Sequence, residues 1–135
     1  TILGFSFKAN TNDTRESPSI SIAYSLINEG ANLTFHDPKV NNYQIENELR
    51  NFHKINADKK QNFDFTWEFD EDIYKAVNKA DAIIILTEWD IYKQLDWERI
   101  SNLMRSPSWV FDTRSVVDNN LSNKYSLNYW YLGRS

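Results

Sequence analysis

Short hydrophobic runs along the chain alternate with segments in which hydrophobic residues recur every three or four positions. The short runs are typical of β-strands, and the longer periodic segments are typical of helices. Strands are predicted over 2–7, 33–35, 63–67, 82–86, 109–111 and 129–132. Helices are predicted over 17–29, in a short form around 45–52, over 70–79 and near 97–104.

Three positions sharpen this pattern. Ser17-Pro18 predicts a helix start, because serine can cap free N–H groups and proline fits the first helical position. Gly30 predicts the end of the same helix. In the first strand, Gly4 would allow a neighbouring backbone to approach closely. The run at 82–86 is hydrophobic throughout, as a parallel strand covered on both faces requires.

Strands that alternate with helices indicate right-handed crossovers and a parallel sheet with helices on both faces. We therefore predict one α/β domain, a Rossmann-like three-layer α/β/α sandwich with a mostly parallel six-stranded sheet in the order 3-2-1-4-5-6. The third strand would lie at an edge. This order places the loops after strands 1, 4 and 5 on one edge of the sheet, near the point where strand order reverses. Ligands of such folds bind at that point.

Those three loops carry distinctive sequences. GFSFK at 4–8 is followed by TNDTRESP at 11–18, TEW stands at 87–89 with Tyr92 beyond it, and FDTR stands at 111–114. In this order, and over nearly the whole chain, they resemble the C-terminal UDP-binding domain of the UDP-glucose/GDP-mannose dehydrogenase family. The TEW sequence resembles the UDP-glucose branch more than the other branches.

The resemblance implies that the first and last of these loops bind a UDP-sugar. It assigns Lys8 and Arg114 to the sugar nucleotide, with Phe7 beside it. A UDP-sugar carries a diphosphate with about two negative charges, which cations outside the strand ends can stabilise if water is partly excluded. The residues alone leave open that Lys8 is a solvated charge and that Arg114 pairs with Asp112 or Asp118.

The resemblance also implies a contact with NAD. It assigns Arg15 to the cofactor, and Asp13 and Glu16 could orient Arg15 or cap the following helix. A surface ion pair is the alternative for Arg15. Glu88 and Trp89 are supporting residues, because the glutamate is expected to hold loop backbone or a facing subunit rather than to act as a base.

Members of this family oxidise a primary alcohol twice, through a thiohemiacetal and a thioester on a catalytic cysteine. The chain has no cysteine and no G-x-G-x-x-G loop, so no catalytic residue is assigned to it. The resemblance therefore implies a fragment, 1–135, that is inactive alone and belongs to a longer, cytoplasmic dehydrogenase. Its partners would be an N-terminal NAD-binding domain, a central helical part and further copies in a homodimer or higher oligomer.

Composition narrows the classes of function further. The 135 residues are 41% hydrophobic and 25% charged, as in a globular domain, and no hydrophobic run is long enough for a membrane span. A net charge of −4 argues against nucleic acid as a partner. Two histidines without ligand spacing and no cysteine argue against a metal site.

Two questions stay open at this point. Asp37 stands at the end of the second strand, where a Rossmann domain would hold a ribose, but without a glycine-rich first turn a turn-forming role is favoured. The chain could also be a self-standing nucleotide-binding or regulatory module, or the same domain of a dehydrogenase for another nucleotide sugar. Residues 41–64 carry no chemistry that the sequence can assign.

Overall fold

The computed structural model describes residues 1–57, 64–118, 120 and 124–133. The strands are β1 (Ile2–Leu3), β2 (Leu33–His36), β3 (Trp67–Phe69), β4 (Ala82–Ile85), β5 (Trp109–Asp112) and β6 (Asn128–Tyr131). The helices are α1 (Pro18–Asn28), α2 (Asn42–Asn56), α3 (Ile73–Ala76), α4 (Asp90–Lys93) and α5 (Trp97–Leu103). The sheet order, β3-β2-β1-β4-β5-β6, confirms the predicted order, and each neighbouring pair is parallel.

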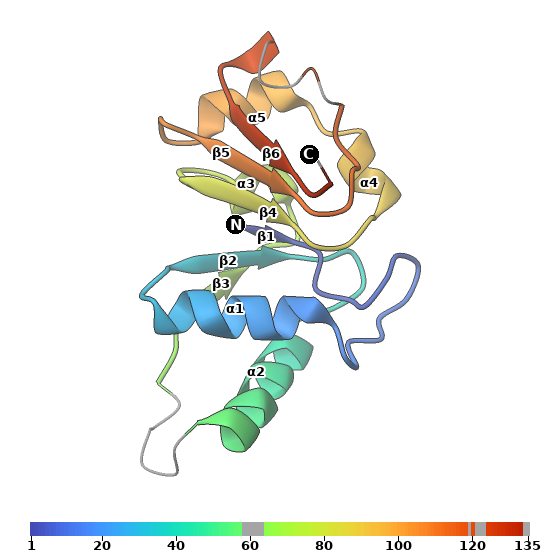
Figure 1. Ribbon diagram of the computed structural model, residues 1–135, viewed down its shortest axis with the longest axis vertical. Coiled ribbons are helices and arrows are strands. Elements are labelled where there is room, and N and C mark those ends of the chain that lie inside the picture. The colour runs from blue at the N-terminus through green and yellow to red at the C-terminus, as the bar shows by residue number, and fades with distance from the viewer. Residues whose placement is uncertain (58–63, 119, 121–123, 134–135) are drawn as a thin grey trace.

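Side chains that alternate along the strands divide the core into two clusters, one on each face of the sheet. In β1, Ile2 packs with α1 and α2, whereas Leu3 packs with α3, α4 and α5. In β4, Ile83 and Ile85 belong to the same cluster as Leu3, and Ile84 packs against the cluster that contains Ile2. A strand covered on both faces needs hydrophobic residues at successive positions, which explains the unbroken run in β4. Figure 1 shows β1 at the middle of the sheet.

The predicted boundaries of the first helix are confirmed. The side chain of Ser17 accepts a hydrogen bond from the backbone N–H of Ser19 (3.3 Å), and Pro18 is the first helical residue. Gly30 follows the helix with a φ of +87°, a conformation that glycine adopts most easily.

The helix around residues 45–52 is longer than predicted. The structure has α2 with 15 residues, and a reciprocal capping box between Asn41 and Gln44 sets its start. Ile45, Leu49 and His53 form its buried stripe, so a histidine that reads as polar in the sequence extends the buried face by one turn. The side chain of His53 is accommodated because Nδ1 lies 2.9 Å from the hydroxyl of Tyr24.

Other predicted elements are shifted or shortened. The first strand ends at Leu3, because Gly4 has a φ of +93° and cannot continue an extended strand. The third strand begins only at Trp67; Phe65 precedes it and packs edge-on against Tyr24, and Phe63 lies outside the described residues. The helix predicted over 70–79 is the four-residue α3, capped by Asp72, and α4 was not predicted.

Candidate functional site

The loops after β1, β4 and β5 lie together at the carboxyl edge of the sheet, as Figure 1 shows at the strand arrowheads. Gly4 opens the first of them, and a Cβ at this position would lie 2.5 Å from Cβ of Thr87. The predicted close approach at Gly4 is therefore confirmed. Beyond it the chain turns outward: Phe5 and Ser6 are buried, whereas Phe7 is 47% exposed and Lys8 is exposed.

The rest of this first loop is closed on itself and tied to α2. The N–H of Phe7 donates to the carbonyl of Asp13 (2.8 Å), and the hydroxyl of Thr14 donates to Oε1 of Glu48 (2.6 Å). Asn10 and Glu16 have φ values of 65° and 57°, a left-handed conformation that asparagine tolerates but that is costly for glutamate. Strained backbone of this kind clusters at functional sites. Glu48, in a segment to which the sequence assigned no chemistry, thus holds the predicted cofactor loop.

Arg15 is brought together with Asp13. Its Nε and Nη2 atoms donate to the two carboxylate oxygens of Asp13, at 2.9 and 2.7 Å, and its backbone N–H also donates to Oδ1. The ion pair with Arg15 lowers the pKa of the Asp13 carboxyl from 3.8 to about 2. Asp13 therefore orients Arg15, while Ser17 caps α1. The side chain of Arg15 stays 85% exposed, and Glu16 is exposed beside it.

The loop after β4 joins this edge through buried contacts. The hydroxyl of Thr87 donates to the carbonyl of Ser6 (2.8 Å), which links the β4 loop to the β1 loop. Trp89 is buried, and its indole N–H donates to Oδ2 of Asp37 (3.2 Å). Between these two anchors Glu88 is half-buried and points its carboxylate to within 3.6 Å of Nε of Arg114.

Arg114 lies between the loops after β4 and β5. Its Nε donates to the carbonyl of Leu86 at the end of β4 (2.9 Å), in addition to the contact with Glu88. The buried carboxylate of Asp112 accepts hydrogen bonds from the backbone N–H of Arg114 and of Val117, each at 2.9 Å. Asp112 therefore shapes the turn that carries Arg114, rather than pairing with its guanidinium.

Asp37 forms a turn, as predicted, but does more than that. Its Oδ1 accepts from the backbone N–H groups of Lys39 and Val40, at 2.8 and 2.9 Å. Its Oδ2 reaches across to the β1 loop and accepts from the N–H of Phe5 (2.8 Å). Sequence reasoning missed this second set of contacts, because nothing in a single Asp-Pro pair indicates what faces it in space.

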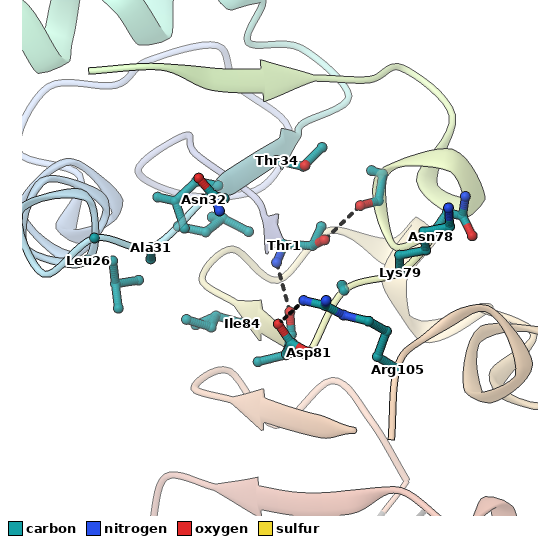
Figure 2. Close-up of a pocket in the computed structure, with 16 residues that line it drawn as sticks. Thr1, Leu26, Ala31, Asn32, Thr34, Asn78, Lys79, Asp81, Ile84 and Arg105 are labelled. Carbon is teal, nitrogen blue, oxygen red and sulfur yellow. Dashed lines mark hydrogen bonds and ion pairs between the residues drawn. The ribbon is translucent and has the colours of Figure 1, made fainter. Parts of the chain in front are cut away.

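A separate hollow of about 440 Å³ lies at the opposite edge, where the strands begin (Figure 2). Figure 2 shows Thr1, Asn32 and Thr34 around it, together with the ion pair between Asp81 and Arg105. No predicted site residue lines this hollow. Ligands of open α/β sheets bind outside the carboxyl ends of the strands, so we place the candidate site at the edge of Lys8 and Arg114 instead.

Two other features of the described part of the chain bear on its function. Among residues 1–57, 64–118, 120 and 124–133, no three Asp, Glu or His side chains gather as a metal site would require. Within the same residues, none of the helices has the length and hydrophobicity needed to cross a membrane.

The fold and the edge loops define a class of protein, the doubly wound α/β domains that bind ligands at the point where strand order reverses. Comparison with known families identifies one family within this class. Residues 1–119 match the model of the UDP-glucose/GDP-mannose dehydrogenase family, UDP binding domain. The chain belongs to this family.

Curated relatives agree with that assignment. The chain is 45% identical to UDP-glucose 6-dehydrogenase of Rattus norvegicus over 117 aligned residues. The alignment covers 87% of this chain and 23% of the relative. It is 35% identical over 133 residues to UDP-glucose 6-dehydrogenase of Drosophila melanogaster, covering 98% of this chain and 28% of the relative. The chain thus spans about a quarter of the length of these relatives.

Solved structures show the same fold. A UDP-glucose dehydrogenase from Pyrobaculum islandicum superposes with a TM-score of 0.62 at 26% identity, over 96% of this chain and 24% of that one. The UDP-D-ManNAc dehydrogenase from Pyrococcus horikoshii superposes with a TM-score of 0.71 at 24% identity, over 98% of this chain and 25% of that one. The Rossmann-like architecture predicted from the sequence is confirmed by these superpositions.

Proposed function

We propose that this chain is the UDP-sugar-binding domain of an NAD-dependent dehydrogenase that oxidises UDP-glucose to UDP-glucuronate. The family assignment and the names of the curated relatives support the substrate class. The observation that carries the proposal is the position of Arg114, which bridges the loops after β4 and β5 beside the loop that presents Lys8.

In this proposal Lys8 and Arg114 hold the diphosphate. The side chain of Arg114 is already fixed by Leu86 and Glu88, so little side-chain freedom is lost when an anion binds. Lys8 is exposed on the neighbouring loop and supplies a second positive charge. Phe7, half-exposed next to it, offers an aromatic ring against which the nucleotide can pack.

The remaining parts of the reaction are assigned to other parts of a longer cytoplasmic polypeptide. This chain contains neither a cysteine nor a G-x-G-x-x-G loop, so the nucleophile and the main NAD-binding contacts would come from an N-terminal NAD-binding domain and from the part that joins it to this one. Bound NAD would accept hydride from the sugar. Arg15, exposed and oriented by Asp13, would reach toward the cofactor, and the whole enzyme would assemble as a homodimer or larger oligomer.

Calorimetric titration of UDP into the protein that contains this chain tests the proposal. Lys8→Ala and Arg114→Ala should each weaken binding by about 1 to 3 kcal/mol, the range for charge-assisted hydrogen bonds. The loss should shrink at high salt, because salt screens the interaction. Arg105→Ala and Lys54→Ala are matched controls, since both side chains are exposed and lie outside the carboxyl-edge loops.

Two results would count against this assignment. Unchanged UDP affinity in both Lys8→Ala and Arg114→Ala would mean that neither residue holds the diphosphate. A loss with UDP-glucose but none with UDP would move the pair to the hexose, where they would orient the alcohol instead.

A further inference from the structure

Asp37 is the most heavily hydrogen-bonded carboxylate described at the carboxyl edge. It is 5% exposed and stands directly after β2, outside the set of residues proposed to touch the ligand. Its Oδ1 accepts from the N–H groups of Lys39 and Val40, as described above. Its Oδ2 accepts from the N–H groups of Phe5 and Ser6, at 2.8 and 3.1 Å, and from the indole of Trp89.

These contacts leave Asp37 no role as a ligand of a ribose. Both oxygens already accept hydrogen bonds from groups of the chain, and the side chain is buried. The N–H groups around Asp37 compensate part of the hydration that its carboxylate loses on burial. What Asp37 does must therefore pass through the groups that it holds.

Two of those groups lie in the β1 loop, which carries Lys8. The N–H groups of Phe5 and Ser6 fix the backbone two and three residues before it. The Ser6 hydroxyl lies 3.1 Å from the carbonyl of Lys8 and 3.3 Å from Oδ2 of Asp37, so it can donate to either. The direction in which the chain leaves the sheet toward Lys8 is thus set by a residue that follows a different strand, β2.

Another of those groups, the indole of Trp89, lies in the β4 loop, which contacts Arg114. The indole of Trp89 is held by Asp37 on one side of the β4 loop. Glu88, the preceding residue, lies 3.6 Å from Nε of Arg114 on the other side. Asp37 is thereby connected to both cations of the proposed diphosphate site, through Phe5 and Ser6 in the β1 loop and through Trp89 and Glu88 in the β4 loop.

We propose that Asp37 is a positioning residue for the nucleotide diphosphate, fixing the β1 and β4 loops so that Lys8 and Arg114 face the same anion. This inference rests on the proposed function. It predicts the direction in which UDP affinity changes when the charge of Asp37 is removed. A negative charge near a diphosphate repels it, so neutralising Asp37 would strengthen binding if charge alone mattered. Positioning requires the opposite, because an amide cannot accept hydrogen bonds on both sides.

UDP titration of Asp37→Asn tests this claim. We expect UDP affinity to fall by about 10- to 100-fold, by analogy with residues that orient the ligands of metal ions. Trp89→Phe removes only the indole donor and keeps an aromatic ring, so about a 2- to 10-fold loss is expected. Asp72→Asn is the matched control, because Asp72 caps α3 through the N–H of Tyr74 and touches none of these loops. All titrations are run at a temperature where circular dichroism shows each variant folded.

A coupling measurement separates positioning from a general loss of stability. If Asp37 acts through Lys8, Asp37→Asn should cost several-fold less UDP affinity when Lys8 is already alanine. Equal losses in both backgrounds, or UDP binding by Asp37→Asn as tight as or tighter than wild type, would overturn the inference. Should Asp37→Asn not fold, Trp89→Phe decides alone, and unchanged UDP affinity in that variant overturns it.

A ligand-free readout keeps this inference distinct from the proposed function. If wild-type protein does not bind UDP, the proposed function is wrong, but the loop connection is still measurable by NMR. Asp37→Asn should then shift the backbone amide resonances of both Lys8 and Arg114, while Asp72→Asn leaves them in place. Unshifted amides in a folded Asp37→Asn variant would refute the connection.

Discussion

Gly4→Ala should be among the most damaging small substitutions in the described part of this chain. Gly4 has a φ of +93°, and an added Cβ would lie 2.5 Å from Cβ, 2.6 Å from Oγ1 and 2.8 Å from the backbone nitrogen of Thr87. Thr87 cannot withdraw easily, because the adjacent N–H of Leu86 donates to the carbonyl of Leu3 (2.9 Å) and fixes the spacing of β1 and β4.

The size of the effect follows from two terms. A non-glycine residue in a left-handed conformation costs about 1 to 2 kcal/mol, and forcing an extra methyl into a packed site costs about 1 to 3 kcal/mol. The sum of about 2 to 5 kcal/mol is a large part of the free energy of unfolding of a domain, about 5 to 15 kcal/mol. For a domain of this size, the melting temperature should fall by about 6 to 25 °C.

Thermal unfolding followed by circular dichroism measures this loss, and Gly30→Ala is the matched control. Gly30 has a similar φ of +87°, but nothing lies within 4 Å of its added Cβ, so only the backbone term applies. The difference between the two variants isolates the contact with Thr87. If Gly4→Ala lowers the melting temperature no more than Gly30→Ala does, the crowding argument is wrong.

Two further predictions concern charge and pH. Arg15→Ala removes the ion pair that holds the Asp13 pKa at about 2, so the pKa of this carboxyl measured by NMR should move back toward 3.8. In the whole enzyme, the same substitution should raise the apparent KM for NAD more than the apparent KM for the UDP-sugar. Two unchanged KM values would contradict a cofactor contact. Burial lowers the pKa of His36 below 6.5, so the unfolded chain takes up this proton at higher pH than the folded one. Stability should be complete above about pH 6.5 and fall below it, less steeply in His36→Asn; a melting temperature that rises on acidification would contradict this.

Local pattern was sufficient for the features of the fold that local physics decides. The hydrophobic run of β4 and the cap at Ser17 could both be predicted, because burial on two faces and helix capping each restrict the residue types allowed. The alternation of elements predicted the parallel sheet with helices on both faces, and the predicted strand order agrees with the structure. The length of α2 did not, since His53 becomes a core residue only through Tyr24, 29 residues earlier in the chain.

In the candidate site, too, some features could be predicted from the sequence and others could not. Lys8 and Arg114 could be named because each lies within three residues of the end of a predicted strand and belongs to a family signature. The connection between their loops through Asp37 and Trp89 could not, because those two side chains are 52 residues apart and meet only in the folded sheet. The contact of Thr14 with Glu48 on α2 was hidden for the same reason, and no spacing rule indicates it.

The central place of β1 in the sheet has a consequence during synthesis. Ile2 pairs with Phe35 of β2 and with Ile84 of β4, so its second partner is made about 80 residues after it. Ribosomes add about 5 to 20 residues per second, whereas a helix such as α1 can form within microseconds. The most buried strand of the domain therefore waits about 4 to 16 s on the ribosome with one hydrogen-bonding edge open, and chaperones that shield extended hydrophobic segments have this interval in which to act.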